Sequence, residues 1–295
     1  MLNISGIKLP MIGDKLVGGN VYFVDSGSGV ANNNNDGLHP VNSPLATLAG
    51  AIAKCTNDNG DFIILLPGHS EATTAEITVN KSDVTIIGVG NGKNRPKITA
   101  TFTAAGDTIA IDDDDVTIDN IYMPASGAAQ NAQIDVNAGN AVIKNCLIEQ
   151  GANNLGGITI TAAGHNSLIF KNEIVITANG PDHAIKIESS TCTDTKIIGN
   201  YLNGLTQVAG WDTGGILCGV AATCVVITDN VVLFVTGNAG CIEITAAATG
   251  IVARNLLGEG ALGQMLDPGS CMCFLNYEAD AVDESGRLFP TSGAA

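Results

Sequence analysis

The sequence predicts an all-β fold, a single-stranded right-handed parallel β-helix (solenoid) with a short N-terminal capping helix. Two repeats with a common period carry this prediction. One is an apolar strand that ends in asparagine and recurs at steps of 25, 27, 28, 30, 25 and 21 residues. The other is a preceding apolar strand, first seen at Ile109, that recurs at steps of 25, 24, 27, 31 and 26 residues. Neither shows a 3.6-residue helical period, so each repeat is expected to be one coil of stacked parallel strands.

The composition favours the same fold. The chain is 45% hydrophobic but only 4% aromatic, and 36 of its 295 residues are glycine. Its apolar residues are mostly Ile, Val, Leu and Ala, and β-branched side chains suit a pleated surface. Small side chains and few aromatics indicate a thin, regular core.

The recurring asparagine is expected to stack in one turn of the solenoid. Equivalent residues of neighbouring coils lie about 4.8 Å apart. Amide side chains at that spacing can hydrogen-bond along the column, at about 1 kcal/mol each. Charged residues stand immediately before several of these asparagines. Among them, we expect Asp119 to pair with Lys144, and Asp229 with Arg254, across neighbouring coils. The predicted ladder is Asn120, Asn145, Asn172, Asn200, Asn230, Asn255 and Asn276.

The repeat divides the chain into four segments. Residues 1–20 precede it as an N-terminal arm, and residues 21–60 contain a first strand and the capping helix. That helix is predicted over residues 43–55, with Ser43 as N-cap and Pro44 at the first helical position. Residues 61–278 form the β-helix, and residues 279–295 form a C-terminal tail.

Charge and cysteine content limit the function classes. A net charge of −16 opposes binding to nucleic acid and to anionic membranes. No 18-residue apolar stretch predicts a membrane span, and the first ten residues do not resemble a signal peptide. None of the eight cysteines forms C-x-x-C, so we expect buried, reduced thiols and no zinc site.

Candidate catalytic and metal-binding side chains are few. Glycan hydrolysis needs two carboxylates at a defined separation, and elimination needs calcium with a basic residue. No such pair can be placed, so no catalytic, cofactor-binding or metal-binding residue is expected. One candidate is an acidic run in a turn, which is either solvated or a weak calcium site: Asp112, Asp113, Asp114 and Asp115. The other is a group around one later strand, namely Asp182, His183 and Glu188, with Glu243 two coils on.

Residues 67–71, with the sequence PGHSE, look like a short site motif. His69 and Ser70 have no acidic partner that the sequence identifies. We therefore expect a turn here.

The strand before each asparagine has two apolar columns, and only one can point into the coil. The other would leave an apolar stripe along the solenoid, which monomers rarely expose. We expect this stripe to be the face of a cyclic homo-oligomer; the alternative is that loops or the C-terminal tail cover it. The predicted face is Val142, Ile169, Ile197, Ile227 and Val252.

Several segments carry a family resemblance. Residues 21–25 (VYFVD), 35–37 (NDG) and 43–52 (SPLATLAGAI), followed by 60–69 (GDFIILLPGH), resemble the start and first coil of pectate-lyase-like right-handed parallel β-helix proteins. The whole chain, including residues 276–290, is similar to β-helix proteins of tailed bacteriophages. No segment matches a lyase catalytic motif.

This resemblance implies a non-enzymatic virion structural protein that decorates or cements the capsid surface, as a homo-oligomer and often a trimer. Its expected partners are copies of itself and the major capsid protein or another virion protein. It would be assembled in the host cytoplasm and need no cofactor. The alternative is a polysaccharide-degrading or glycan-binding protein like a tailspike, with a host surface glycan as ligand.

Overall fold

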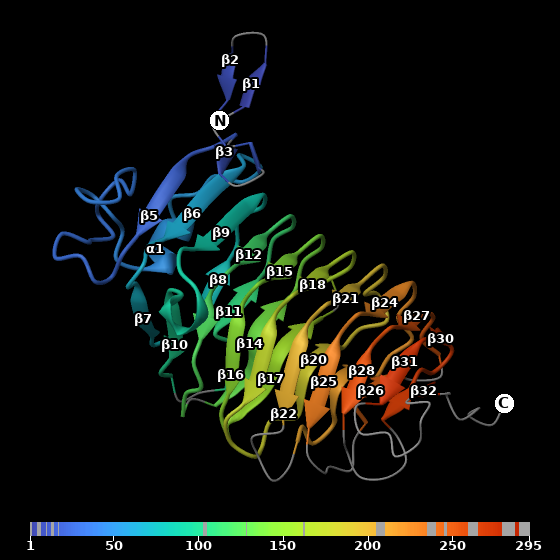
Figure 1. Ribbon diagram of the computed structural model, residues 1–295. Helices are drawn as coiled ribbons and strands as arrows, with labels where there is room; N and C mark the ends of the chain where they lie inside the picture. Colours follow the sequence, from blue (N-terminus) through green and yellow to red (C-terminus); the bar gives the residue numbers. More distant parts are fainter. Residues whose placement is uncertain are drawn as a thin grey trace.

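The computed structural model describes residues 18–102, 105–127, 129–161, 163–204, 210–234, 240–244, 247–258 and 265–278, and the backbone of short strands on either side of these ranges. Within them the chain is a parallel β-solenoid whose coils stack from one end to the other (Figure 1). This confirms the predicted all-β solenoid. The described helices are one α-helix, α1 (Leu48–Ile52), and one 3-10 turn, η1 (Gly92–Asn94). No helix in these ranges is long and apolar enough to cross a membrane.

Three sheets form the walls of the solenoid, and each coil adds one strand to each sheet. The first sheet contains β5 (Val21–Val24), β6 (Asp61–Leu65), β9 (Val84–Gly88), β12 (Thr117–Asp119), β15 (Val142–Lys144), β18 (Leu168–Phe170), β21 (Lys196–Ile198), β24 (Val225–Thr228), β27 (Gly250–Ala253) and β30 (Met272–Phe274).

The second sheet contains β7 (Ser70–Thr73), β10 (Lys97–Ala100), β13 (Tyr122–Met123), β16 (Leu147–Gln150), β19 (Glu173–Ile176), β22 (Tyr201–Gly204), β25 (Val231–Phe234), β28 (Leu256–Gly258), β31 (Asn276–Glu278) and β32 (Arg287–Leu288). The third contains β8 (Ile77–Val79), β11 (Ile109–Ile111), β14 (Gln130–Val136), β17 (Asn154–Ile160), β20 (His183–Ile187), β23 (Gly214–Cys218), β26 (Ile242–Ile244) and β29 (Leu266–Asp267). All pairings in the three sheets are parallel except that of β32 with β31.

Of the N-terminal arm, the structure describes two antiparallel strand pairs and residues 18–20. The pairs are β1 (Leu2–Ile4) with β2 (Ile7–Leu9), and β3 (Met11–Ile12) with β4 (Lys15–Leu16). Within the predicted C-terminal tail, β32 pairs with β31, and the rest of the tail lies outside the described residues.

The predicted capping helix is not supported. In place of a helix over residues 43–55, the structure has α1, which has only five residues. Thr47 is its N-cap, and the Thr47 hydroxyl accepts a hydrogen bond from the Gly50 backbone N–H at 3.0 Å. Ser43 is instead tied to the preceding loop, where its hydroxyl donates to Asp36 at 2.6 Å. The Ser-Pro signal therefore marks a turn that precedes the helix by several residues.

The predicted oligomer face is wrong for four of its five residues. Ile169, Ile197, Ile227 and Val252 are fully buried and line the interior of the first sheet, in one column with Ile118 and Ile143. Val142 alone points outward, because it pairs with Leu168 and not with Ile169. A one-residue shift in strand register moves a side chain to the opposite face, which is the physical reason for the error.

The asparagine ladder exists, with five members. From Asn172 to Asn255, each side-chain Nδ2 donates to the Oδ1 of the next asparagine at 2.9 to 3.1 Å. Each backbone N–H donates to the same oxygen at 2.9 to 3.0 Å. All the members are buried, and they are Asn172, Asn200, Asn230, Asn255 and Asn276.

Asn120 and Asn145 do not belong to this ladder. They lie one register position earlier, so Ile121 and Cys146 occupy the places that asparagine fills in later coils. Both adopt the left-handed conformation, with φ of 63° and 55°, which asparagine tolerates better than most residues. Later coils put other residues at this corner: Lys171, Gly199, Asp229, Arg254 and Leu275.

The predicted charge pairs across coils are confirmed. Lys144 Nζ lies 3.3 Å from Asp119 Oδ2. Arg254 donates to both carboxylate oxygens of Asp229, at 2.7 and 2.6 Å. Because the second pair is largely exposed, it adds little stability.

Candidate functional site

A polar pocket of about 300 Å³ lies on the outer face of the third sheet. Three of its side chains, Asp135, Thr159 and Lys186, share one register position on the neighbouring strands β14, β17 and β20. Asp107, just before β11, lies beside them and accepts a hydrogen bond from the Ala132 backbone N–H at 2.8 Å. Four successive coils therefore build one concave surface, which is hereafter called the third-sheet pocket.

His183 reaches the third-sheet pocket because a glycine lies beneath its ring. Its register partner is Gly156, where an added Cβ would lie 2.5 Å from His183 Nε2. That nitrogen lies 3.1 Å from the Thr159 hydroxyl, and the histidine is buried. Any larger residue at position 156 would displace the ring.

The carboxyl groups of the third-sheet pocket hold their protons unusually tightly. Burial, followed by the charge of Asp107, raises the pKa of Asp135 to about 7. Burial also raises the pKa of Asp107 to about 6, and burial with the charge of Asp212 raises the pKa of Asp182. One oxygen of Asp135 is buried without a hydrogen-bond partner among the described residues. The pocket thus contains carboxyl groups that are protonated part of the time near neutral pH.

The basic groups of this pocket are neutral or already paired. Burial, followed by the charge of Lys186, lowers the pKa of His183 to about 3, so its ring is neutral. Lys186 forms an ion pair with Glu188. The pocket can therefore donate and accept hydrogen bonds, but it carries excess negative charge when Asp107 and Asp135 are ionised.

The structure brings together some of the candidate residues and not others. Asp182, His183 and Glu188 all line the third-sheet pocket, whereas Glu243 does not. Glu243 Oε1 instead accepts a hydrogen bond from the Gly240 backbone N–H at 2.5 Å. Sequence reasoning missed Asp107 and Asp135, although an acidic residue between two core isoleucine and valine positions, Ile134 and Val136, was a usable signal for Asp135.

The acidic run forms a turn between β11 and β12. Its Asp114 accepts a hydrogen bond from the Gly139 backbone N–H at 2.7 Å, and Asp112 accepts one from the Asn137 side chain at 3.1 Å. Among the described residues, no group of three or more His, Cys, Asp or Glu is arranged to hold a metal ion. The run therefore serves to order the turn on the next coil.

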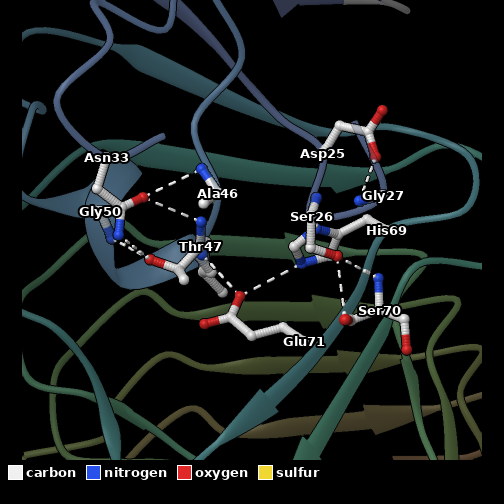
Figure 2. Close-up of polar contacts among 11 residues, drawn as sticks. Asp25, Ser26, Gly27, Asn33, Ala46, Thr47, Gly50, His69, Ser70 and Glu71 are labelled. Carbon is white, nitrogen blue, oxygen red and sulfur yellow. Dashed lines mark hydrogen bonds and ion pairs between the residues drawn. The ribbon is translucent and has the colours of Figure 1, made fainter. Parts of the chain in front are cut away.

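His69 has an acidic partner, contrary to the expectation from its motif. His69 Nε2 lies 3.3 Å from Glu71 Oε2 (Figure 2), and this oxygen also accepts a hydrogen bond from the Leu48 backbone N–H at 2.7 Å. His69 Nδ1 accepts a hydrogen bond from the Ser26 backbone N–H at 3.0 Å, so its proton lies on Nε2, facing Glu71. This buried cluster joins the end of β5, α1 and β7, and His69 Nε2 approaches Glu71 without making a hydrogen bond to any described residue.

Exposed apolar side chains gather on the last coils. They come from β27, β28, β30 and β31 and the corner between the first two sheets. Outward apolar side chains of earlier coils, such as Leu168, Phe170 and Val226, are only partly exposed, so exposed apolar side chains are concentrated at this end of the solenoid. The residues, hereafter the C-terminal apolar surface, are Ile251, Leu256, Met272, Phe274, Leu275 and Tyr277.

Comparison with known proteins identifies no family. No protein-family model and no curated protein matches the sequence. Among solved structures, the ORF18 protein of Geobacillus virus E2 is similar, at 12% identity and a TM-score of 0.43. The matched region covers 78% of this chain and 57% of that chain, so this chain spans little more than half the length of ORF18. Likeness at this level carries no argument about function.

Proposed function

We propose that this chain is a non-enzymatic structural protein of a tailed-bacteriophage virion, where it decorates or cements the capsid surface as a homo-oligomer. The observation that carries the proposal is the C-terminal apolar surface, where six exposed apolar side chains gather on the last coils. Such a surface fits a protein that contacts copies of itself or a shell protein. The sequence resemblance of the whole chain, including residues 276–290, to β-helix proteins of tailed bacteriophages supports the same conclusion.

The surface proposed for self-association differs from the one that the sequence indicated. Ile169, Ile197 and Ile227 belong to the core, so they cannot form an interface. Met272 and Phe274 are 66% and 39% exposed, and they lie on β30, the last strand of the first sheet. A trimer, with the major capsid protein or another virion protein as its further partner, is the assembly that we propose.

Light scattering on the purified protein tests self-association. The chain has a mass of 30.0 kDa, and the proposal expects a single species at about three times this mass. Met272→Asp with Phe274→Asp should convert it to monomer without changing its far-ultraviolet circular dichroism. Asp113→Asn, in a turn remote from this surface, is the control. A wild-type protein that is monomeric at all concentrations would contradict the proposal.

A second candidate function is glycan binding or cleavage in the third-sheet pocket. The observation that favours it is the raised pKa of Asp135, to about 7, beside a second carboxyl group. A carboxyl group that keeps its proton near neutral pH is suited to general acid catalysis. Host capsular and lipopolysaccharide preparations, with and without calcium, are the substrates to assay. New reducing ends or unsaturated uronates that disappear in Asp135→Asn would establish this function and overturn the non-enzymatic proposal.

A further inference from the structure

A second pocket, of about 230 Å³, lies at the corner between the first and second sheets in the first coils. The turn containing Gly68 and Ser70 forms one side, and Lys93, Arg95 and Lys97 form the other. No carboxylate lines it among the described residues. The whole chain has only 13 lysines and arginines, so three of them around one small pocket is a marked concentration of positive charge.

One of the three charges is already neutralised. Lys93 Nζ lies 2.6 Å from Glu149 Oε1, and the other oxygen of Glu149 accepts a hydrogen bond from the Tyr122 hydroxyl at 2.7 Å. The Lys93 side chain is also 70% exposed, far more than that of its partner Glu149. It is therefore expected to contribute little to a ligand.

Arg95 is held in place by neutral acceptors. Its Nε donates to Asn120 Oδ1 at 2.6 Å, and its Nη1 donates to the Gly92 carbonyl oxygen at 3.2 Å. Neither acceptor carries a charge, so the guanidinium keeps its full positive charge. A fixed guanidinium with donors to spare is well suited to bind a planar or tetrahedral oxyanion.

Lys97 also lacks a counter-charge. Its backbone N–H donates to the His69 carbonyl oxygen at 2.9 Å, which fixes the residue beside the turn that contains Gly68. Its Nζ lies 5.8 Å from the centre of the Tyr122 ring. Among the described residues, no carboxylate lies within 4.0 Å of the charged groups of Lys97 or Arg95. The pocket therefore presents two cations without a carboxylate partner: a guanidinium held by two hydrogen bonds, and a lysine whose backbone is fixed beside the turn.

We propose that this pocket binds an oxyanion, namely the phosphate, sulfate or carboxylate group of a small ligand, through Arg95 and Lys97. The proposal does not depend on the virion role. The net charge of −16 disfavours general anion binding by this protein. Saturable binding of a small anion would thus report a built site.

Calorimetric titration with inorganic phosphate and with sulfate, at constant ionic strength in chloride, tests the proposal. We expect saturable binding with one site per chain. Lys97→Met should weaken it at least tenfold, Lys93→Met by less than about threefold, and Lys196→Met, on the first sheet, not at all. Lys97→Arg should restore binding, which separates loss of charge from loss of fold, and thermal melting checks each variant.

Glucose 6-phosphate and glucuronate distinguish the sources of the oxyanion. Tighter binding of either than of free phosphate would indicate that the group is presented on a sugar, whereas equal or weaker binding would indicate a free anion. Two results would overturn the proposal: no saturable binding of any of the four anions, or an equal loss in the Lys97, Lys93 and Lys196 variants.

Discussion

Asn200 Nδ2 donates a hydrogen bond to Asn230 Oδ1 at 3.0 Å, although the two residues are 30 positions apart in the chain. The backbone N–H of Asn200 donates to the same oxygen at 2.9 Å. A further hydrogen bond runs from Asn200 Nδ2 back to the Ile169 carbonyl oxygen, also at 2.9 Å. One buried amide thus satisfies polar groups on both neighbouring coils, which fixes the spacing and the register of the stack.

Asn200→Ala should lower the free energy of unfolding by about 3 kcal/mol. The substitution leaves the buried Ile169 carbonyl and the Asn172 backbone N–H without their partners. Urea denaturation measures the loss. Asn145→Gly is the control: position 145 has a positive φ that glycine adopts without strain, and the variant loses only the hydrogen bond from Nδ2 to Asp119 Oδ1 at 2.8 Å, so it should cost at most about half as much. Equal losses in the two variants would refute the five-membered ladder.

Ile197→Asp should unfold the protein and not merely separate its subunits. Its side chain is fully buried in the column shared with Ile169 and Ile227, and an unpaired charge there is too costly to retain. Val226→Asp is the matched control on the outward face, beside Lys196 in register, and should keep the native circular dichroism spectrum. A folded, monomeric Ile197→Asp variant would show that the inside and outside have been assigned the wrong way round.

The contribution of Asp135 and Asp107 to stability should fall as the pH rises from about 4 to 7, whereas that of the buried His183, whose pKa is lowered to about 3, changes in the opposite direction. Burial raises the pKa of Asp135 to about 7 and that of Asp107 to about 6, so the folded protein binds protons that the unfolded chain releases over this window. The stability that these protons contribute is complete below the unfolded pKa and lost above the folded one. Relative to wild type, Asp135→Asn should become progressively more stable between pH 4 and 7 and then level off.

Urea denaturation at pH 4, 5.5, 7 and 8 measures this difference. Asp267→Asn, which removes an exposed aspartate from the same sheet, is the control for the loss of one carboxylate. A difference between Asp135→Asn and wild type that stays constant from pH 4 to 8 would be incompatible with the protonation of Asp135.

All eight cysteines should titrate as free thiols in denaturant. In the native protein only Cys224 should react quickly, because it alone is exposed while Cys273 is partly buried and the other six are buried. Burial also raises the pKa of Cys55 and Cys146 to about 12, which suppresses their reactive thiolates. A native thiol count well above one, or a denatured count well below eight, would contradict this arrangement.

The fold could be predicted from the sequence because each coil repeats the same two apolar strands. The spacing between the repeated asparagines could not determine the strand register to within one residue. Asn145 and Asn172 end similar strands, yet Asn145 occupies the left-handed corner and Asn172 points inward. That single shift assigned Ile169 to the wrong face. The structural cue is the residue before the buried asparagine, which takes a positive φ in each later coil, as at Gly199.

The third-sheet pocket could be predicted only in part. Asp182, His183 and Glu188 lie close together in the sequence, so their proximity was evident. Asp107 and Asp135 come from earlier coils, and only the lateral stacking of strands brings them to the same surface. The orientation of His183 depends on Gly156, and this role could not be predicted without knowing that the two residues pair across neighbouring strands.

Cryo-electron microscopy of virions produced from a genome that contains this sequence tests the proposed virion role. We expect solenoid-shaped density on the outer surface of the capsid, into which the three-sheet coil fits with the C-terminal apolar surface at a protein contact. Particles that lack this density, and in which mass spectrometry does not detect the chain, would contradict the proposed virion role.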